Sequence, residues 1–541
     1  MQIPNESQES ITANIVSRCW KKLSIRKQFL LPKFSSFPSP LFPFILSPMR
    51  FLVATLFLSL SILHANEIPK KEAEKKEEAK KVIQEDSVTI DGKKIDYRTT
   101  ASTLQLKTDD SKDRASIFHV AYERLGIKDR VKRPVVFAFN GGPGSSAVWL
   151  HLGALGPKIV PTSEDGTKTL PPPQAVIPNV NSILDVADLV FIDPVSTGYS
   201  RPAGDAKANQ FHGVDEDIES VGDFIRRWTT ENDRWASPKF LLGESYGGIR
   251  AAGLSNHLQE KYGMSLNGVV LLSPLIDYRT LRSAQGDDLS YSIFLPGMTA
   301  TSHYHKKITG DRDTLVEEAY DYAFGPYATA LIKGAAISAE EKSAVAKKLS
   351  AFTGLPPSLF EDTNLRLSSS RFRKELLREE GKVIGRFDAR TAWPLVNKSE
   401  DYAAYDPSYS VVYGAFATGM NDYLSRTLNW EGHHPYNILS RSVQPWNWGP
   451  RNTITNMSRH VENALRSNPD LRFLVMSGYT DLATPAANMQ HSISHLFGIP
   501  SDRRKAIEFT FYEAGHMFYL NQPDLKKMRT DLVKFITPDL Q

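Results

Sequence analysis

A G-x-S-x-G motif, Gly243-Glu244-Ser245-Tyr246-Gly247, lies between the apolar run 240–242 and a segment of helical periodicity, 249–262. This order of strand, motif and helix is typical of a nucleophile elbow. The flanking glycines permit a sharp, strained turn that makes a serine hydroxyl project from the end of a sheet. The pattern therefore predicts that Ser245 is a nucleophile; a structural serine in a buried turn is the alternative.

A serine hydroxyl needs a base to accept its proton and an acid to orient that base. In the chain order typical of this elbow, the acid and then the base follow the serine. The strand-like run 473–476 leads to Asp481, and the next such run, 507–511, leads to His516. Either residue alone would be ordinary. Together, at successive strand ends, Ser245, Asp481 and His516 are the predicted catalytic triad.

A glycine-rich loop, residues 140–146, follows another buried strand-like run, 134–139. Such a loop supplies one backbone N–H of an oxyanion hole, and the residue after the nucleophile supplies the second. We assign these two N–H groups to Gly142 and Tyr246. A phosphate-binding loop is the alternative, but no Gly-Lys-[Ser/Thr] sequence closes this loop, which disfavours it.

These motifs resemble those of the serine carboxypeptidases, a family of exopeptidases in the α/β-hydrolase superfamily. Residues 140–146 are similar to the family's N-G-G-P-G-C-S-S loop, 155–157 to L-G-P, 191–200 to D-x-P-x-G-x-G-[FY]-S, and 243–248 to G-E-S-Y-G-G. The expected fold is an α/β-hydrolase fold with a mixed, mostly parallel central sheet and an inserted, mainly helical cap. The expected function is cleavage of C-terminal residues from peptides or proteins through an acyl-enzyme on Ser245, without a cofactor or metal.

The resemblance assigns the same triad, Ser245, Asp481 and His516. It also implies that Asn140, Gly141 and Glu244 bind the terminal carboxylate of the substrate, with Glu244 in its protonated form. A carboxyl group facing a carboxylate binds a proton readily, because two like charges at short range are costly. Peptidase activity in this family accordingly favours acidic pH.

Two positions depart from the family pattern. Ala154 stands just before L-G-P, where the family usually has a second carboxylate-binding glutamate, so carboxylate recognition is weakened or built differently. Ser145 replaces the cysteine of the loop and leaves the triad unchanged. Ala154 favours the nearest alternative function, a serine esterase or acyltransferase with the same triad. A non-catalytic binding protein on this scaffold is a further alternative.

Residues 49–65 have the features of an export signal, whereas residues 1–48 are unusually long and rich in proline for the start of a signal peptide. Met49-Arg50 precedes an apolar run, 51–63, of signal-peptide length, which ends near Ala65. We predict cleavage after Ala65, with translation starting at Met49 or with a longer leader from Met1. The run is short for a transmembrane helix, so we expect an exported protein, periplasmic or extracellular, without stable membrane insertion. Residues 66–86 are expected to be a charged, flexible linker.

The formal net charge of +4 comes from this leader. Residues 1–65 hold seven of the 65 Lys and Arg and two of the 61 Asp and Glu, which leaves 58 basic against 59 acidic residues. A nearly neutral protein does not predict nucleic-acid binding. The single cysteine, Cys19, also lies in the leader. The processed chain would therefore have no disulfide. Because eukaryotic members of the family that it resembles commonly carry disulfides, the resemblance favours a bacterial envelope over a vacuole or lysosome.

The candidate triad extends from Ser245 to His516, so one catalytic domain must span most of the chain. The alternation of strands and helices stops after residue 272 and resumes at residue 473. We therefore expect the core at 87–278 and 466–541 and the cap at 279–465. An antiparallel hairpin is expected around Asp91-Gly92.

Overall fold

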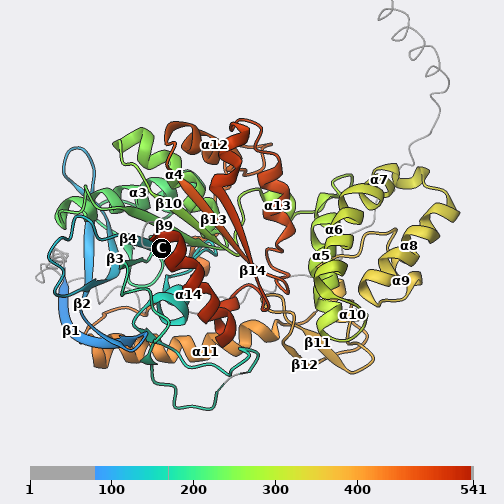
Figure 1. Cartoon of the computed structure of the whole chain (residues 1–541), viewed down its shortest axis with the longest axis horizontal. Coiled ribbons are helices and arrows are strands. Elements are labelled where there is room, and N and C mark those ends of the chain that lie inside the picture. The colour runs from blue at the N-terminus through green and yellow to red at the C-terminus, as the bar shows by residue number, and fades with distance from the viewer. Residues whose placement is uncertain (1–79, 169, 402, 538–541) are drawn as a thin grey trace, which may run out of the picture. The chain divides into compact units, whose positions relative to one another are not determined.

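The computed structural model describes residues 80–168, 170–401 and 403–537. The predicted leader, the signal peptide and most of the charged linker lie outside the described residues. Within them, a ten-stranded sheet has helices on both faces, and a group of helices from the middle of the chain lies beside it (Figure 1).

The sheet is mixed and mostly parallel, as expected. Its strand order is β1-β2-β3-β7-β4-β9-β10-β13-β14, and β8 also pairs with β3. The pairs from β1 to β7 are antiparallel, whereas all pairs from β7 to β14 are parallel. The strands are β1 (Lys81–Ile90), β2 (Lys93–Lys107), β3 (Asp113–Arg124), β4 (Val135–Phe139), β7 (Asp188–Ile192), β8 (Arg201–Pro202), β9 (Lys239–Glu244), β10 (Gly268–Leu272), β13 (Arg472–Gly478) and β14 (Ile507–Tyr512).

The hairpin of β1 and β2 turns at Asp91 and Gly92, as predicted. Both residues have positive φ, 46° and 75°, which a tight two-residue turn of this twist requires. The last part of the linker expected at 66–86 is instead a strand, because β1 begins at Lys81 and its first residues pair with β2. Charged side chains there suit an edge strand, which they protect from pairing with other chains.

Helices cover both faces of the parallel strands. One face packs against α3 (Val214–Glu231), α4 (Gly247–Tyr262) and α12 (Ser458–Ser467). The other packs against α2 (Val148–Leu150), α11 (Pro407–Asp422) and α14 (Gln522–Ile536). Strands β4, β7, β9 and β10 are therefore buried along their whole length, which explains their continuous apolar sequences.

The inserted region divides into two parts that pack differently. The helices α5 to α10 share a hydrophobic cluster of their own, which includes Phe294, Leu349 and Phe372. In contrast, α11 and α12 pack on the sheet, through residues such as Phe416 and Val461. The range 279–465 thus combines a helical cap with segments of the core. The cap helices are α5 (Leu289–Tyr304), α6 (Arg312–Tyr322), α7 (Ala328–Lys333), α8 (Ala339–Thr353), α9 (Pro357–Asp362) and α10 (Ser369–Glu375).

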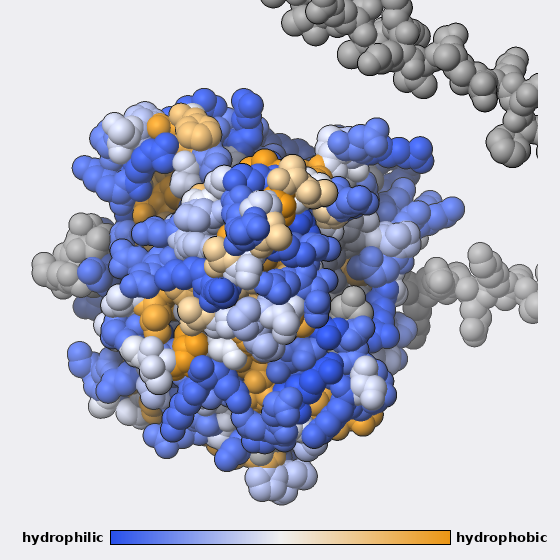
Figure 2. Space-filling model, turned by 90° about the vertical axis from the view of Figure 1, so that its right-hand side faces the viewer, coloured by the Kyte–Doolittle hydropathy of each residue, from blue (hydrophilic) through white to orange (hydrophobic). Residues whose placement is uncertain are grey.

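The cap side of the molecule is mainly polar on its surface. Figure 2 shows this side, where hydrophilic side chains predominate and hydrophobic ones form small patches between them. The apolar side chains of α5 to α10 are accordingly directed into their own cluster. In the described part of the chain, no helix is both long enough and apolar enough to cross a membrane.

Candidate active site

Ser245 lies in a sharp turn between β9 and α4. Its φ of 62° is in the left-handed region, which strains a residue with a side chain. A Cβ atom on Gly243 would collide with the carbonyl oxygen of Gly247, so the turn requires glycine there. Ser245 itself is partly exposed, although its neighbours Glu244 and Tyr246 are buried. This is the geometry that the G-x-S-x-G motif predicts.

Asp481 and His516 follow the neighbouring parallel strands β13 and β14 and form a buried pair. His516 Nδ1 lies 2.8 Å from Asp481 Oδ2. Burial lowers the pKa of His516, but the Asp481 carboxylate, its hydrogen bond and the nearby Glu244 outweigh burial and raise that pKa. The aspartate thus holds the imidazole and leaves its Nε2 atom available to another group.

Thr484 completes this pair and was not anticipated from the sequence. Its hydroxyl lies 2.9 Å from Asp481 Oδ2 and 3.0 Å from His516 Nδ1, and it donates to the carbonyl of Ser273 at 2.7 Å. Asp481 Oδ1 in turn accepts the N–H groups of Ala483 and Thr484. These contacts fix which carboxylate oxygen faces the imidazole.

Ser245 and His516 line the same cavity, which has a volume of about 330 Å³. Asn140, Gly141, Gly142 and Glu244 line it as well, so the structure brings most of the predicted site residues together. Among the hydrogen bonds of the described residues, none joins Ser245 Oγ to His516 Nε2. In ligand-free hydrolases this contact is often long and tightens only when substrate binds.

The glycine-rich loop lies directly against the elbow. A Cβ atom on Gly141 would be 2.5 Å from the backbone nitrogen of Tyr246, so only glycine permits this approach. Gly142 has a φ of 106°, which also favours glycine. Within the described residues, neither the N–H of Gly142 nor that of Tyr246 donates a hydrogen bond to the protein. Two neighbouring N–H groups are thus available at the predicted oxyanion hole.

Glu244 is a buried carboxyl group beside the nucleophile. Its Oε2 atom accepts a hydrogen bond from Asn140 Nδ2 at 2.9 Å and another from the Tyr519 hydroxyl at 2.8 Å. Burial outweighs the opposing effects of His516 and these two donors and raises the pKa of Glu244 to about 7. Glu244 is therefore neutral at acidic pH. Ala154 is buried in the hydrophobic core and provides no second carboxyl group.

A buried ion pair, Arg250 and Asp217, contacts both the elbow and the glycine-rich loop. Arg250 Nε lies 2.8 Å from Asp217 Oδ2, and Arg250 Nη1 donates to the carbonyl of Asn140 at 2.6 Å. The hydroxyl of Tyr246 also donates to Asp217, at 3.2 Å. One feature of the sequence could have indicated this network: an arginine lies within the otherwise apolar start of α4.

Replacement of Arg250 by leucine is expected to lower the free energy of unfolding by about 3–5 kcal/mol, because it leaves the Asp217 charge buried without a partner. Urea denaturation of the variant and of the parent protein measures the difference. The double variant Asp217→Asn, Arg250→Leu removes the stranded charge and should regain part of the loss. An unchanged midpoint for Arg250→Leu would show that the pair does not stabilise the fold.

Comparison with known proteins agrees with this geometry. A family model described as serine carboxypeptidase matches residues 104–517. Serine carboxypeptidase-like 29 of Arabidopsis thaliana is 29% identical over 173 residues, 30% of this chain, and the match spans 33% of that protein's length. Kex1(delta)p, a prohormone-processing carboxypeptidase from Saccharomyces cerevisiae, has a solved structure that shares the α/β-hydrolase fold, with a TM-score of 0.52 and 19% identity over 82% of this chain and 92% of that one. Since the family model covers well over half of the sequence, the chain belongs to the serine carboxypeptidase family.

Proposed function

We propose that the protein is a serine carboxypeptidase that removes C-terminal residues from peptides. The observation that carries this proposal is one cavity lined by Ser245, His516 and the buried carboxyl group of Glu244. A serine and a histidine held by aspartate are the groups that acyl transfer needs. A neutral carboxyl group at the same place suits a substrate that ends in a carboxylate.

In the proposed mechanism, Ser245 Oγ attacks the carbonyl carbon of the last peptide bond while His516 Nε2 accepts its proton. Asp481 holds the imidazole through Nδ1 and stabilises its positive charge. The N–H groups of Gly142 and Tyr246 donate to the oxyanion. His516 then protonates the leaving amine, and the C–N bond breaks to give the acyl-enzyme. Water, activated by His516, attacks the ester and releases the shortened peptide.

The terminal carboxylate of the substrate is proposed to bind to Asn140, Gly141 and Glu244. Neutral Glu244 can donate a hydrogen bond to it, whereas ionised Glu244 would repel it. This contact would place the last peptide bond, rather than an internal one, at Ser245. It thereby accounts for exopeptidase activity.

The activity is expected to have a bell-shaped pH dependence. As the pH rises through about 7, Glu244 loses its proton and kcat/KM for peptides with a free C-terminus should fall. On the acidic side, protonation of His516 removes the base; because its pKa is raised, this limb lies above the usual range of a histidine and close to the Glu244 limb, so the activity maximum should be narrow. Initial rates across the pH range test both limbs. An alkaline limb that persists unchanged in Glu244→Gln would show that another group causes it.

Competition between blocked peptides with free and with amidated C-termini tests the proposal. A carboxypeptidase should cleave the free acid and leave the amide nearly untouched, because the amide lacks the negative charge and the second acceptor oxygen of a carboxylate. Equal rates for both peptides would contradict the proposal. They would favour the second candidate, a serine esterase or acyltransferase. The observation in its favour is Ala154, which provides no second carboxyl group to bind a C-terminus.

The proposal includes export, which rests on residues 49–65. Sequencing of the N-terminus of the mature protein from its native source should begin at Asn66, after the predicted cleavage site. A mature chain that retains residues 49–65 would contradict export by this signal.

A further inference from the structure

Tyr519 is a buried tyrosine beside the cavity whose role goes beyond the proposed mechanism. It lies in η9 (Phe518–Leu520), shortly after His516, and its hydroxyl donates to Glu244 Oε2 at 2.8 Å. Burial, together with the charge of Glu244, raises the pKa of Tyr519 well above its usual value. The hydroxyl therefore keeps its proton at all working pH values and acts as a constant donor.

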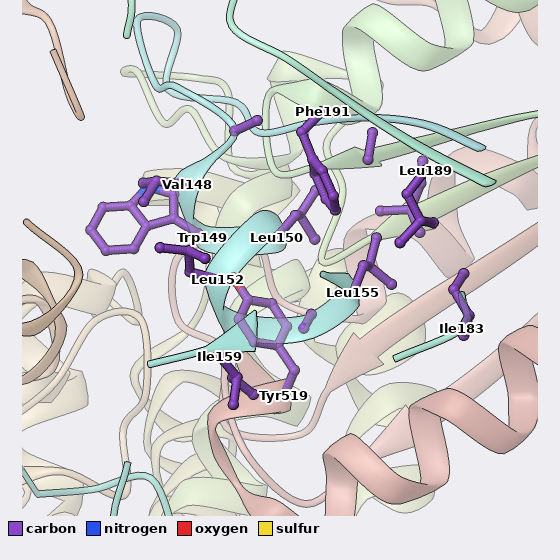
Figure 3. Close-up of a cluster of buried hydrophobic side chains, with 14 of the residues drawn as sticks. Val148, Trp149, Leu150, Leu152, Leu155, Ile159, Ile183, Leu189, Phe191 and Tyr519 are labelled. Carbon is purple, nitrogen blue, oxygen red and sulfur yellow. The ribbon is translucent and has the colours of Figure 1, made fainter. Parts of the chain in front are cut away.

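Small residues make room for the ring of Tyr519. Figure 3 shows Tyr519 beside η1 (His151–Leu155), close to Leu152 and Ile159. A Cβ atom on Gly153 would lie 2.8 Å from Tyr519 Cε2, so a side chain there would displace the ring. Ala154, the next residue, belongs to the same hydrophobic cluster as Tyr519. The chain thus has no glutamate at position 154, and the phenol of Tyr519 contacts Glu244 instead.

Both hydrogen bonds to Glu244 are accepted by the same oxygen atom, Oε2. Asn140 Oδ1 accepts the N–H of Leu150 at 3.2 Å, which orients the amide so that Nδ2 donates to Glu244 Oε2. A carboxyl proton on Oε2 would face the Nδ2 hydrogen of Asn140, which can only donate, and the Tyr519 hydroxyl has no other acceptor among the described residues toward which it could turn its own hydrogen. Glu244 Oε1, in contrast, makes no hydrogen bond with any described residue, and Glu244 lines the cavity in front of Ser245. The proton of the neutral acid is therefore favoured on Oε1.

We propose that Tyr519 is a positioning residue that fixes the acid proton of Glu244 on Oε1, from which it donates to the carboxylate of a bound peptide. The inference rests on the proposed function and specifies how this chain recognises a C-terminus without a second glutamate. The other charged groups that act on Glu244 are His516 and Asp481. Arg386 and Arg441 line the same cavity, and the substitutions below leave all four in place.

The variant Tyr519→Phe tests this role because it keeps the ring and removes only the donor. Loss of a hydrogen bond to the ionised form raises the pKa of Glu244, so the alkaline limb of kcat/KM should move up by about one to two pH units. At acidic pH, KM for free-acid peptides should rise a few-fold with little change in kcat, because the proton is no longer directed at the substrate. Tyr512→Phe is the matched control, since this buried tyrosine donates instead to Asp531, at 2.6 Å.

Infrared titration of the protonated carboxyl group provides a readout that needs no turnover. The band of Glu244 is assigned by its loss in Glu244→Gln, and its midpoint should move to higher pH in Tyr519→Phe but not in Tyr512→Phe. That result would support the inference even if the wild-type protein cleaved no peptide, an outcome that would count against the proposed function alone. An unmoved midpoint in Tyr519→Phe, or an equal shift in both variants, would overturn the inference.

Discussion

Replacement of Ser245 by alanine is expected to lower kcat on peptides by about a million-fold. The residual rate is the one that substrate binding and the oxyanion hole support without the nucleophile. The variant lacks the oxygen that attacks the carbonyl carbon, whereas the elbow keeps its backbone geometry because alanine tolerates a φ of 62° no worse than serine does. Steady-state assays with a blocked peptide that ends in a free carboxylate measure the loss. Peptide binding itself should persist.

A matched control for this variant is Ser255→Ala in the helix that follows the elbow, α4. The Ser255 hydroxyl is buried and donates to the carbonyl of Ala252, away from the cavity. Its removal should leave kcat close to that of the parent protein. Full activity of Ser245→Ala, or an equal loss in both variants, would remove Ser245 from the proposed role.

Replacement of Asp481 by asparagine should lower kcat by about ten thousand-fold with little effect on folding. Asp481 Oδ1 accepts two backbone N–H groups, so the asparagine must place its oxygen there and its NH₂ group toward His516. The NH₂ group then donates to Nδ1, which shifts the ring proton to Nε2. An imidazole in this tautomer cannot accept the proton of Ser245.

The kinetics of Asp481→Asn and nitrogen NMR of His516 together check this explanation. The spectrum should show the ring proton on Nδ1 in the parent protein and on Nε2 in the variant. Asp531→Asn is the control, because Asp531 pairs with Tyr512 and Lys527 outside the cavity, and it should retain activity. A fast Asp481→Asn enzyme would refute the assignment of Asp481 as the orienting acid.

The elbow and the order of the triad could be predicted because they depend on local rules. Glycines around Ser245 dictate a tight turn, and runs of apolar residues identify the buried parallel strands that end at Asp481 and His516. Carboxyl ends of parallel strands meet at one edge of a sheet, so the three residues had to converge. A local turn signal, Asp-Gly between two strand-like runs, likewise identified the hairpin at Asp91-Gly92.

The supporting contacts could not be predicted, because they join segments that are distant in the chain. Tyr519 reaches Glu244 across 275 positions, and no periodicity indicates such a pair. The packing of α11 was missed for a related reason: an apolar helix face does not reveal which surface it will cover. The first residues of β1 were assigned to the linker because their charges indicate exposure to solvent. Edge strands and flexible segments are both exposed, so charge alone does not distinguish them.

Labelling with a fluorophosphonate tests the central claim most directly, because this reagent reacts with a serine only where a base activates it. Intact mass and peptide mapping should show one adduct, on Ser245, in the wild-type protein, with greatly slowed labelling in His516→Ala. Absence of an adduct, or an adduct on another serine while Ser245 stays unmodified, would contradict the account.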